Sequence, residues 1–232
     1  MSKVPAFNGF PREAVRFYRE LTKHNDRVWF EAHKDTYKER VLAPAQEFVL
    51  AMGERLRRVS PGIVADPRTS GAGSIFRIHR DTRFGRDKRP YKTYLGIFFW
   101  EGNGKKTENP GFYFQLEPNG FMLGVGAYML TKPDLEAFRK AVVHKTRGPA
   151  LARAIKKVKR KGYEIGGAHY KRVPRGFDPE HPNAEYLRHN GLYAYTEGRI
   201  PGELYTRDLL GFCLKAFKDM YPIHEWIVEN VK

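Results

Sequence analysis

The segment from Phe112 to Tyr128 constrains the fold of this chain more than any other. Its first half alternates apolar Phe112, Phe114 and Leu116 with polar side chains, which is typical of a strand with one buried face. Pro118-Asn119-Gly120 then supplies turn chemistry, and a second apolar stretch follows directly. Because strands joined by so short a turn pair antiparallel, this segment is predicted to be an antiparallel hairpin.

Helical patterns flank this strand-rich part of the sequence. In residues 11–60, and over most of residues 132–232, apolar side chains recur at the spacing of one helix face. Residues 74–128 change to a period of two or are continuously apolar, and a late strand is expected near residues 191–196. We therefore predict an α+β fold, with a central, mainly antiparallel sheet of about four to six strands flanked by N-terminal and C-terminal helices, in a single domain over residues 1–232.

Charge and composition limit the class of protein. The chain has a formal net charge of +16, and its 41% hydrophobic and 14% aromatic residues argue against disorder. Its N-terminus lacks the apolar core of a signal peptide, no run is long and apolar enough to span a membrane, and the single Cys213 fits a reducing compartment. We expect a cytoplasmic protein that does not bind membranes and whose partners are acidic, such as phosphates or nucleic acids.

The basic run from Arg77 to Lys92 is the strongest functional signal. Its sixteen positions hold seven Lys or Arg and two Asp. Close like charges repel by about 1 kcal/mol or more per pair at a protein surface, so a folded arrangement of them needs anionic partners, either in the protein or in a ligand. The run is therefore predicted to mark a site.

The first residues of this run are predicted to enter the sheet. Phe76 and Ile78 alternate with polar side chains, which indicates a strand whose other face is polar. Arg80 would then point to the apolar side, where an unpaired charge costs several kcal/mol, so that it needs Asp81 or Asp87 as a partner. The residues that follow are expected to form a loop that displays its side chains.

A phosphorylated or carboxylated small ligand is the partner predicted for the run. Arginine binds oxyanions through two nitrogens, lysine adds a point charge, and a tyrosine hydroxyl donates a hydrogen bond. A strand face with Tyr113 and Gln115 could join the site, as could a polar loop with Arg172 and Arg175 that folds back beside the run. The predicted ligand-binding residues are Arg77, His79, Arg80, Asp81, Arg83, Asp87, Lys88, Tyr91, Lys92, Tyr113, Gln115, Arg172 and Arg175. The sequence leaves open whether the protein is also an enzyme, and it predicts no oligomeric state.

Two alternative functions remain. Residues 139–161 hold ten Lys or Arg and no acid, as a nucleic-acid-binding module with basic surface helices would. Most of these charges alternate with an apolar stripe, however, as they do on solvated helix faces. The third interpretation is an interaction protein in which the basic run is a structural salt-bridge network. In the nucleic-acid alternative, the residues that contact phosphates would be Arg153, Lys156, Lys157, Arg160 and Lys161.

No metal site and no cofactor are predicted. The eight histidines show no H-x-x-x-H or H-E-x-x-H spacing, and one cysteine excludes a thiolate-rich zinc site. Gly71-Ala72-Gly73 and Gly102-Asn103-Gly104 lack the complete phosphate-loop pattern and are interpreted as turns.

Four segments together resemble one protein family. The run from Arg77 to Lys92 is similar to the signature of a bacterial conserved-hypothetical family, the domain of unknown function numbered 2461. The other three segments are Asn-Asp-Arg-Val-Trp-Phe at residues 25–30, Gly-Phe-Tyr-Phe-Gln at 111–115 with Gly-Val-Gly at 124–126, and Arg-Val-Pro-Arg-Gly-Phe at 172–177. These matches span nearly the whole chain. The resemblance implies membership of the family and carries no activity over to this chain.

Overall fold

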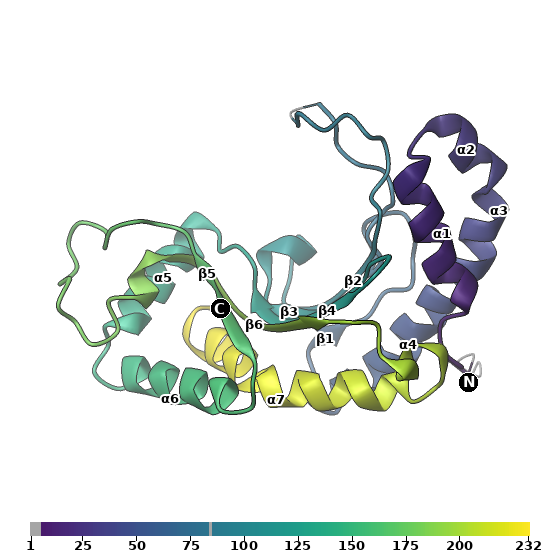
Figure 1. The fold of residues 1–232 in the computed structure, drawn as a ribbon. Helices are drawn as coiled ribbons and strands as arrows, with labels where there is room; N and C mark the ends of the chain where they lie inside the picture. Colours follow the sequence, from purple (N-terminus) through teal and green to yellow (C-terminus); the bar gives the residue numbers. More distant parts are fainter. Residues whose placement is uncertain (1–5, 84) are drawn as a thin grey trace. The chain divides into compact units, whose positions relative to one another are not determined.

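The computed structural model describes residues 6–83 and 85–232, so that residues 1–5 and Phe84 lie outside the described part of the chain. The fold is α+β, with helices toward both ends of the chain (Figure 1). Within the described residues, six strands form one antiparallel sheet in the order β1-β2-β3-β4-β6-β5. The predicted fold class is confirmed.

Helices and strands have the following bounds. The strands are β1 (Ile63–Val64), β2 (Leu95–Glu101), β3 (Gly111–Leu116), β4 (Phe121–Ala127), β5 (Glu164–Ala168) and β6 (His189–Gly198). The α-helices are α1 (Arg12–Lys23), α2 (Arg27–Ala32), α3 (Lys34–Thr36), α4 (Ala43–Arg57), α5 (Lys132–Val142), α6 (Arg147–Lys159) and α7 (Leu209–Asn230). A π-helical segment, η1 (Tyr37–Leu42), joins α3 to α4, and short 3-10 turns are η2 (Lys106–Glu108), η3 (Tyr186–Arg188) and η4 (Gly202–Tyr205).

The predicted hairpin is formed by β3 and β4, which are neighbours in the sheet. The Glu117 N–H donates a hydrogen bond to the Gly120 carbonyl at 2.9 Å and closes the turn. Phe112, Phe114 and Leu116 are fully buried, as their alternation predicts. This part of the fold follows directly from the sequence pattern.

The strand β5 was not predicted, because residues 132–232 were expected to be helical apart from one late strand. It pairs antiparallel with β6, and Glu164 lies opposite Tyr195. Gly166 and Gly167 give the segment a low strand propensity. The tertiary structure needs a glycine here, since a Cβ on Gly166 would lie 2.4 Å from the ring of Tyr193. The late strand, β6, is also longer than predicted.

Residue contacts divide the chain into two compact units. The first comprises the residues up to Phe99, Tyr113–Met122 and Glu197–Lys215, and the second comprises Trp100–Phe112, Leu123–Thr196 and Ala216–Lys232. In the first unit, the ring centroid of Phe114 lies 5.0 Å from that of Phe48 and 5.9 Å from that of Phe10. In the second unit, the rings of Phe138 and Trp226 are 5.8 Å apart. Each unit therefore has aromatic contacts in its own core, and the single-domain organisation stays a prediction.

Candidate functional site

The basic run forms two backbone arms that lie side by side in the first unit (Figure 1). The Arg80 N–H donates to the Pro90 carbonyl at 2.8 Å, and the Lys92 N–H donates to the Ile78 carbonyl at 2.7 Å. We call residues 75–83 and 85–92 the basic hairpin.

The regular strand predicted after Ser74 is not formed. Isolated bridges join Ile75 to Ile97 and His79 to Tyr91 instead. Because Pro90 cannot donate to a backbone ladder, regular pairing does not extend from the second bridge. Ile75 and Ile78 are buried while Phe76 is only partly buried, so the expected period of two is wrong here.

Three arginines of the basic hairpin pair with its two aspartates. The Asp87 carboxylate lies 2.7 Å from the Arg80 guanidinium and 2.7 Å from that of Arg89. Asp81 binds Arg83 at 2.7 Å. Each aspartate also accepts the backbone N–H two residues further on, at 3.2 Å from Arg83 and 3.1 Å from Arg89. Asp87 is thus one of the two partners predicted for Arg80, whereas the pairing with Arg89 was missed.

These bonds keep both carboxylates ionised. Hydrogen bonds from the Arg83 side chain and then from its backbone lower the pKa of Asp81 to about 2. The same two kinds of bond from Arg89, together with the charge of Arg80, hold the pKa of Asp87 well below its usual value. A carboxylate that is ionised near neutral pH is a poor proton donor, so neither aspartate is suited to general acid catalysis.

Two cations at the base of the basic hairpin lack such partners. Within residues 6–83 and 85–232, Arg77 and Lys92 form no ion pair with a carboxylate. Lys92 is partly buried, and that burial, followed by the charges of Arg77 and Arg80, lowers its pKa. Its Nζ lies 5.4 Å from the centre of the Phe76 ring, a contact that an ammonium group favours. Arg77 and Arg80 therefore both repel the Lys92 ammonium at the base of the hairpin.

A row of polar side chains lies on β3 and the turn that follows it. The Tyr113 hydroxyl donates to the Gln115 side-chain oxygen, and the Gln115 amide donates to Glu117 at 2.5 Å. Gly96 on the adjacent β2 leaves room for this row, because a Cβ there would lie 3.0 Å from the Tyr113 hydroxyl and 3.2 Å from Phe76. Tyr113 and Gln115 therefore share one face of β3, as predicted.

Tyr94 connects this row electrostatically to the base of the basic hairpin. Burial raises the pKa of Tyr94, the charge of Arg80 lowers it, and the charge of Glu117 raises it. Burial, followed by Tyr94 and Glu117, also raises the pKa of Tyr113 far above its ordinary value, so Tyr113 stays neutral and can donate a hydrogen bond. Tyr94 was not among the predicted ligand-binding residues, although a tyrosine directly before an apolar strand was an available signal. We call the following residues the polar site: Arg77, Arg80, Lys92, Tyr94, Tyr113, Gln115 and Glu117.

Tyr91 has a different place from the one predicted. The sequence assigns it to a loop that displays its side chains, but its ring is buried, with 3% of the residue exposed. The ring stacks on Phe30 at 4.2 Å between centroids. The Asn25 side chain both donates to the Tyr91 carbonyl and accepts from its N–H, each at 3.0 Å. Tyr91 therefore anchors the basic hairpin, and exposed His79 lies opposite it with its ring centre 5.2 Å away.

One further predicted residue, Lys88, contacts the opposite arm of the basic hairpin. The Lys88 ammonium donates to the Thr82 carbonyl at 2.9 Å, so it links the two arms of the hairpin. Arg172 and Arg175 are exposed and belong to the second unit. Their approach to the basic run stays a prediction.

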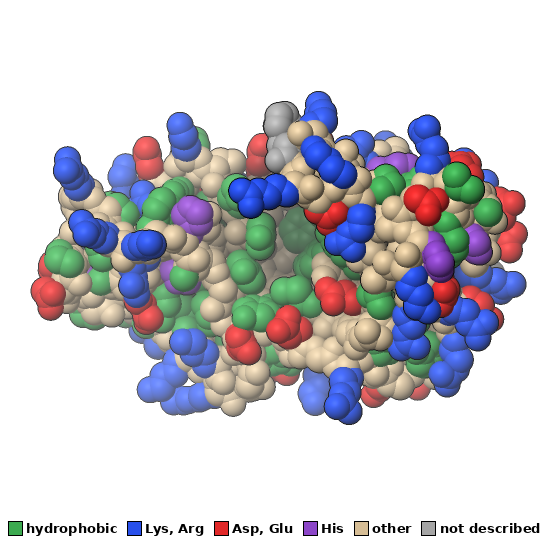
Figure 2. All heavy atoms as spheres, turned by 45° about the horizontal axis from the view of Figure 1, so that its top comes forward, with side chains coloured by type: hydrophobic (Ala, Val, Ile, Leu, Met, Phe, Trp, Pro, Cys, Tyr) green, Lys and Arg blue, Asp and Glu red, His purple; other side chains and the backbone are tan. Residues whose placement is uncertain are grey.

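The basic face of α6 is exposed as the solvated-face interpretation requires. Leu151, Ile155 and Val158 are buried, while the Lys and Arg side chains named for nucleic-acid contact are exposed. Lys161, directly beyond the helix, forms an ion pair with Asp219. Figure 2 shows Lys and Arg side chains spread over the visible face, with Asp and Glu between them.

A buried histidine is the other notable titratable group. His224 is fully buried, and its Nε2 lies 2.6 Å from a Glu101 oxygen. No sequence pattern pointed to this pair.

Among the described residues, no group of three or more His, Cys, Asp and Glu side chains could hold a metal ion. None of the helices in the described part is both long and apolar enough to cross a membrane.

Comparison with known proteins agrees with the four-segment resemblance. The model of one family, described as "Conserved hypothetical protein (DUF2461)", matches residues 13–226. The search of curated proteins finds no match. The matched range contains the whole basic hairpin and the whole polar site. The chain therefore belongs to the family of the domain of unknown function numbered 2461.

Proposed function

We propose that this protein binds a small phosphorylated or carboxylated ligand at the polar site. One observation carries the proposal: Lys92 is held partly buried beside Arg77 and Arg80, and neither Lys92 nor Arg77 forms an ion pair with a carboxylate in the described part of the chain. Like charges gathered in a partly desolvated place destabilise the fold. An anion bound there would remove this repulsion and gain charge-assisted hydrogen bonds.

The other residues of the polar site suit recognition of an oxyanion. Arg77 offers a planar guanidinium for bidentate binding, and neutral Tyr113 supplies a hydroxyl. Asp87 holds Arg80 in position at 2.7 Å. Since Asp81 and Asp87 are held ionised and Tyr113 is held neutral, these three groups do not serve proton transfer near neutral pH. The proposal is therefore limited to binding.

A titration of the Lys92 amine tests this function. We expect orthophosphate or citrate to bind the wild-type protein, measured by isothermal titration calorimetry, and to raise the pKa of Lys92, followed by the NMR shift of its Cε. Lys92→Met should weaken binding by about tenfold, the effect of losing one charged hydrogen bond. Arg153→Ala, which removes an exposed charge from α6, is the matched control. The proposal fails if neither anion moves the Lys92 titration, or if both variants bind as the wild type does.

The ion pairs favour a second function for the basic hairpin. Arg80, Arg83 and Arg89 each bind an aspartate of the same hairpin at 2.7 Å. Such a network would hold the hairpin in shape for a partner, as in the interaction-protein alternative. If Arg80→Ala unfolds the protein and Lys92→Met leaves anion binding intact, this second function replaces the first. Binding of nucleic acid by α6 would appear instead as an affinity for oligonucleotides that falls steeply with salt.

The cytoplasm remains the proposed location. Cys213 is buried, and burial raises the pKa of its thiol, which leaves it unreactive and compatible with a reducing compartment.

A further inference from the structure

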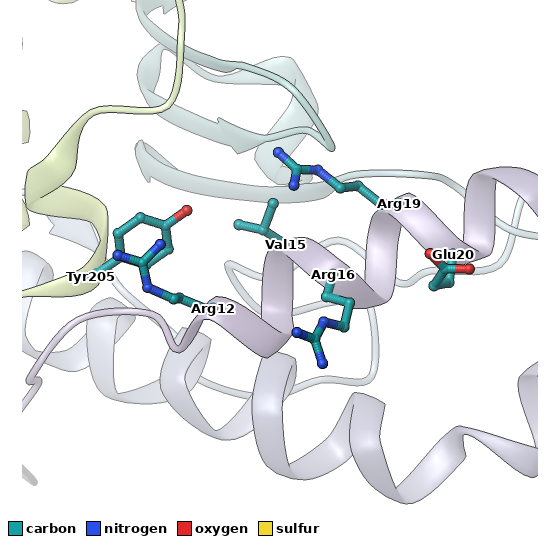
Figure 3. A pocket seen from close by; sticks show the side chains of 6 residues that line it. All are labelled: Arg12, Val15, Arg16, Arg19, Glu20 and Tyr205. Carbon is teal, nitrogen blue, oxygen red and sulfur yellow. The ribbon is translucent and has the colours of Figure 1, made fainter.

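A second cluster of cations lines a pocket beside α1. The pocket has a volume of about 360 Å³ and is lined by Arg12, Val15, Arg16, Arg19, Glu20 and Tyr205 (Figure 3). The lining residues come from α1 and η4, both in the first unit. None of them belongs to the polar site, so this pocket is a separate candidate.

The helix explains why three arginines meet at one pocket. α1 buries Ala14, Phe17 and Leu21 in the core. Arg12, Arg16 and Arg19 follow one another at intervals of four and three residues, which places them on a common face of the helix. Over these intervals the helix rises by about 6 Å and then about 4.5 Å. The three charges are therefore spread along the pocket.

Two of the arginines are held in place by neutral groups. The Arg12 guanidinium lies over the Tyr205 ring, 4.5 Å from its centre. The Arg19 Nε donates to the Pro118 carbonyl at 2.9 Å. Figure 3 shows Arg12 beside Tyr205 at one end of the pocket and Arg19 further along α1, with Val15 between them. These contacts position both guanidiniums and leave their charges unneutralised.

The carboxylate of the pocket is already engaged elsewhere. Glu20 accepts a hydrogen bond from Lys23 at 3.0 Å. That bond, together with the charges of Lys23, His24 and Arg16, lowers the pKa of Glu20. Among the described residues, none of the three arginines forms an ion pair with a carboxylate. The pocket thus presents three guanidiniums and one ionised carboxylate that Lys23 already shares.

We infer that this pocket binds a small anion carrying two linked phosphate groups. Its volume lies at the lower end of the range of small-molecule sites, roughly 300 to 1,000 Å³, and it fits a diphosphate or a nucleoside diphosphate. Guanidinium forks match phosphate oxygens in pairs. Because Arg12 and Arg19 lie at separate places along the helix, a ligand with two anionic groups can reach both, whereas a single phosphate occupies only one end.

Calorimetric titration with inorganic pyrophosphate, orthophosphate and ADP tests the inference. We expect pyrophosphate to bind at least about tenfold more tightly than orthophosphate, since a second phosphate adds charged hydrogen bonds. Arg12→Ala and Arg16→Ala should each weaken pyrophosphate binding by about tenfold. Both side chains are exposed, so the variants should fold, and circular dichroism would check this. ADP identifies the source of the diphosphate: tighter binding of ADP indicates a nucleotide, and equal binding indicates an inorganic chain.

Two matched variants separate this pocket from other causes. Arg207→Ala removes an exposed arginine that lies two positions from Tyr205 and does not line the pocket, so it should leave pyrophosphate affinity within about twofold. Lys92→Met changes the polar site and should leave the pocket unaffected. The inference is overturned if pyrophosphate binds no more tightly than orthophosphate, if Arg12→Ala and Arg16→Ala bind as the wild type does, or if Lys92→Met alone abolishes binding.

Discussion

The outer part of the basic hairpin and its base satisfy their charges in different ways. In the outer part, Arg83 and Arg89 each bind an aspartate two residues away in the sequence. At the base, Arg77 and Lys92 form no carboxylate pair in the described part of the chain, and Lys92 is partly buried. Arg83 and Arg89 of the outer part are therefore paired by local sequence, whereas the base holds a partly buried cation, Lys92, beside Arg77 and Arg80. Because the base combines positive charge with partial burial, it is the part of the hairpin for which we propose an anionic ligand.

The largest effect on stability should come from removing the Tyr91 ring, which attaches the base of the hairpin to Phe30. Tyr91→Ala removes a ring that is 3% exposed and stacks on Phe30, so we expect the free energy of unfolding to fall by about 3 kcal/mol or more. Urea denaturation measures this loss. Tyr91→Phe keeps the stacked ring and should remain within about 1 kcal/mol of the wild type. Equal stability of Tyr91→Ala and the wild type would show that the base is not anchored as described.

The second effect compares ligand binding by the base and by the outer part. Arg77→Ala should weaken binding of orthophosphate or citrate by about tenfold, because Arg77 forms no ion pair within residues 6–83 and 85–232 that would compete with the ligand. Arg83→Ala should change the affinity by less than about twofold, because Asp81 already engages that arginine. Calorimetry with both variants measures the contrast. A larger loss in Arg83→Ala would reverse the assignment of the ligand to the base.

The ion pair between Arg80 and Asp87 should have a smaller effect on stability. Their side chains are 33% and 35% exposed, and partly exposed pairs contribute about 1 kcal/mol or less. We expect Arg80→Ala to lower the free energy of unfolding by about that amount in urea. Complete unfolding of Arg80→Ala would mean that the ion-pair network is essential to the fold.

Removing the excess charge should slightly stabilise the ligand-free protein. The folded-state pKa of Lys92 is lowered, so its charged form disfavours folding below that pKa, and this penalty disappears as pH rises through it. Lys92→Met should therefore raise stability at pH 7 by about 0.5 kcal/mol and lose this advantage at high pH. Thermal unfolding at several pH values measures it. A lower melting temperature for Lys92→Met at pH 7 would argue against repulsion at the base.

The smallest effect should appear only in acid. The folded-state pKa of Asp81 is about 2, below the ordinary value of 3.8 for an aspartate, so Asp81 adds stability above pH 3.8 and loses it as pH falls toward 2. In Asp81→Asn, the urea midpoint should depend less on pH over this acidic interval. The stability of this variant at pH 7 should differ little from that of the wild type. An unchanged acid profile would show that the pair of Asp81 with Arg83 does not persist in solution.

Much of the fold and part of the site could be predicted. The alternation of Phe112, Phe114 and Leu116 identified the central hairpin, because every second residue of a strand is apolar when one face of the sheet is buried. Asp81 and Asp87 were predicted as alternative partners of Arg80 because a partly buried guanidinium needs a nearby carboxylate, and Asp87 is the one that pairs with it. Local patterns report such features reliably because the interacting residues are close in sequence.

The misses have a common physical cause. Tyr91 was predicted to display its side chain from a loop. Instead, Asn25, sixty-six positions away, binds the Tyr91 backbone, and the Tyr91 ring stacks on Phe30. β5 was missed because Gly166 has a low strand propensity and is required only by the ring of Tyr193. In each case, a contact with a residue distant in the sequence determines the structural role of the residue. Local propensity does not include such contacts.

The sequence by itself determined the α+β class, the hairpin of β3 and β4, and the high density of charge in residues 77–92. Only the tertiary structure decided which of those charges are neutralised. Pairs such as Asp81 with Arg83 form between near neighbours in the chain. Tyr94, directly before β2, and Tyr113 on β3 interact because β2 and β3 are neighbours in the sheet. Charge density can be read along a chain, but charge balance depends on distances in space, and folding determines those distances.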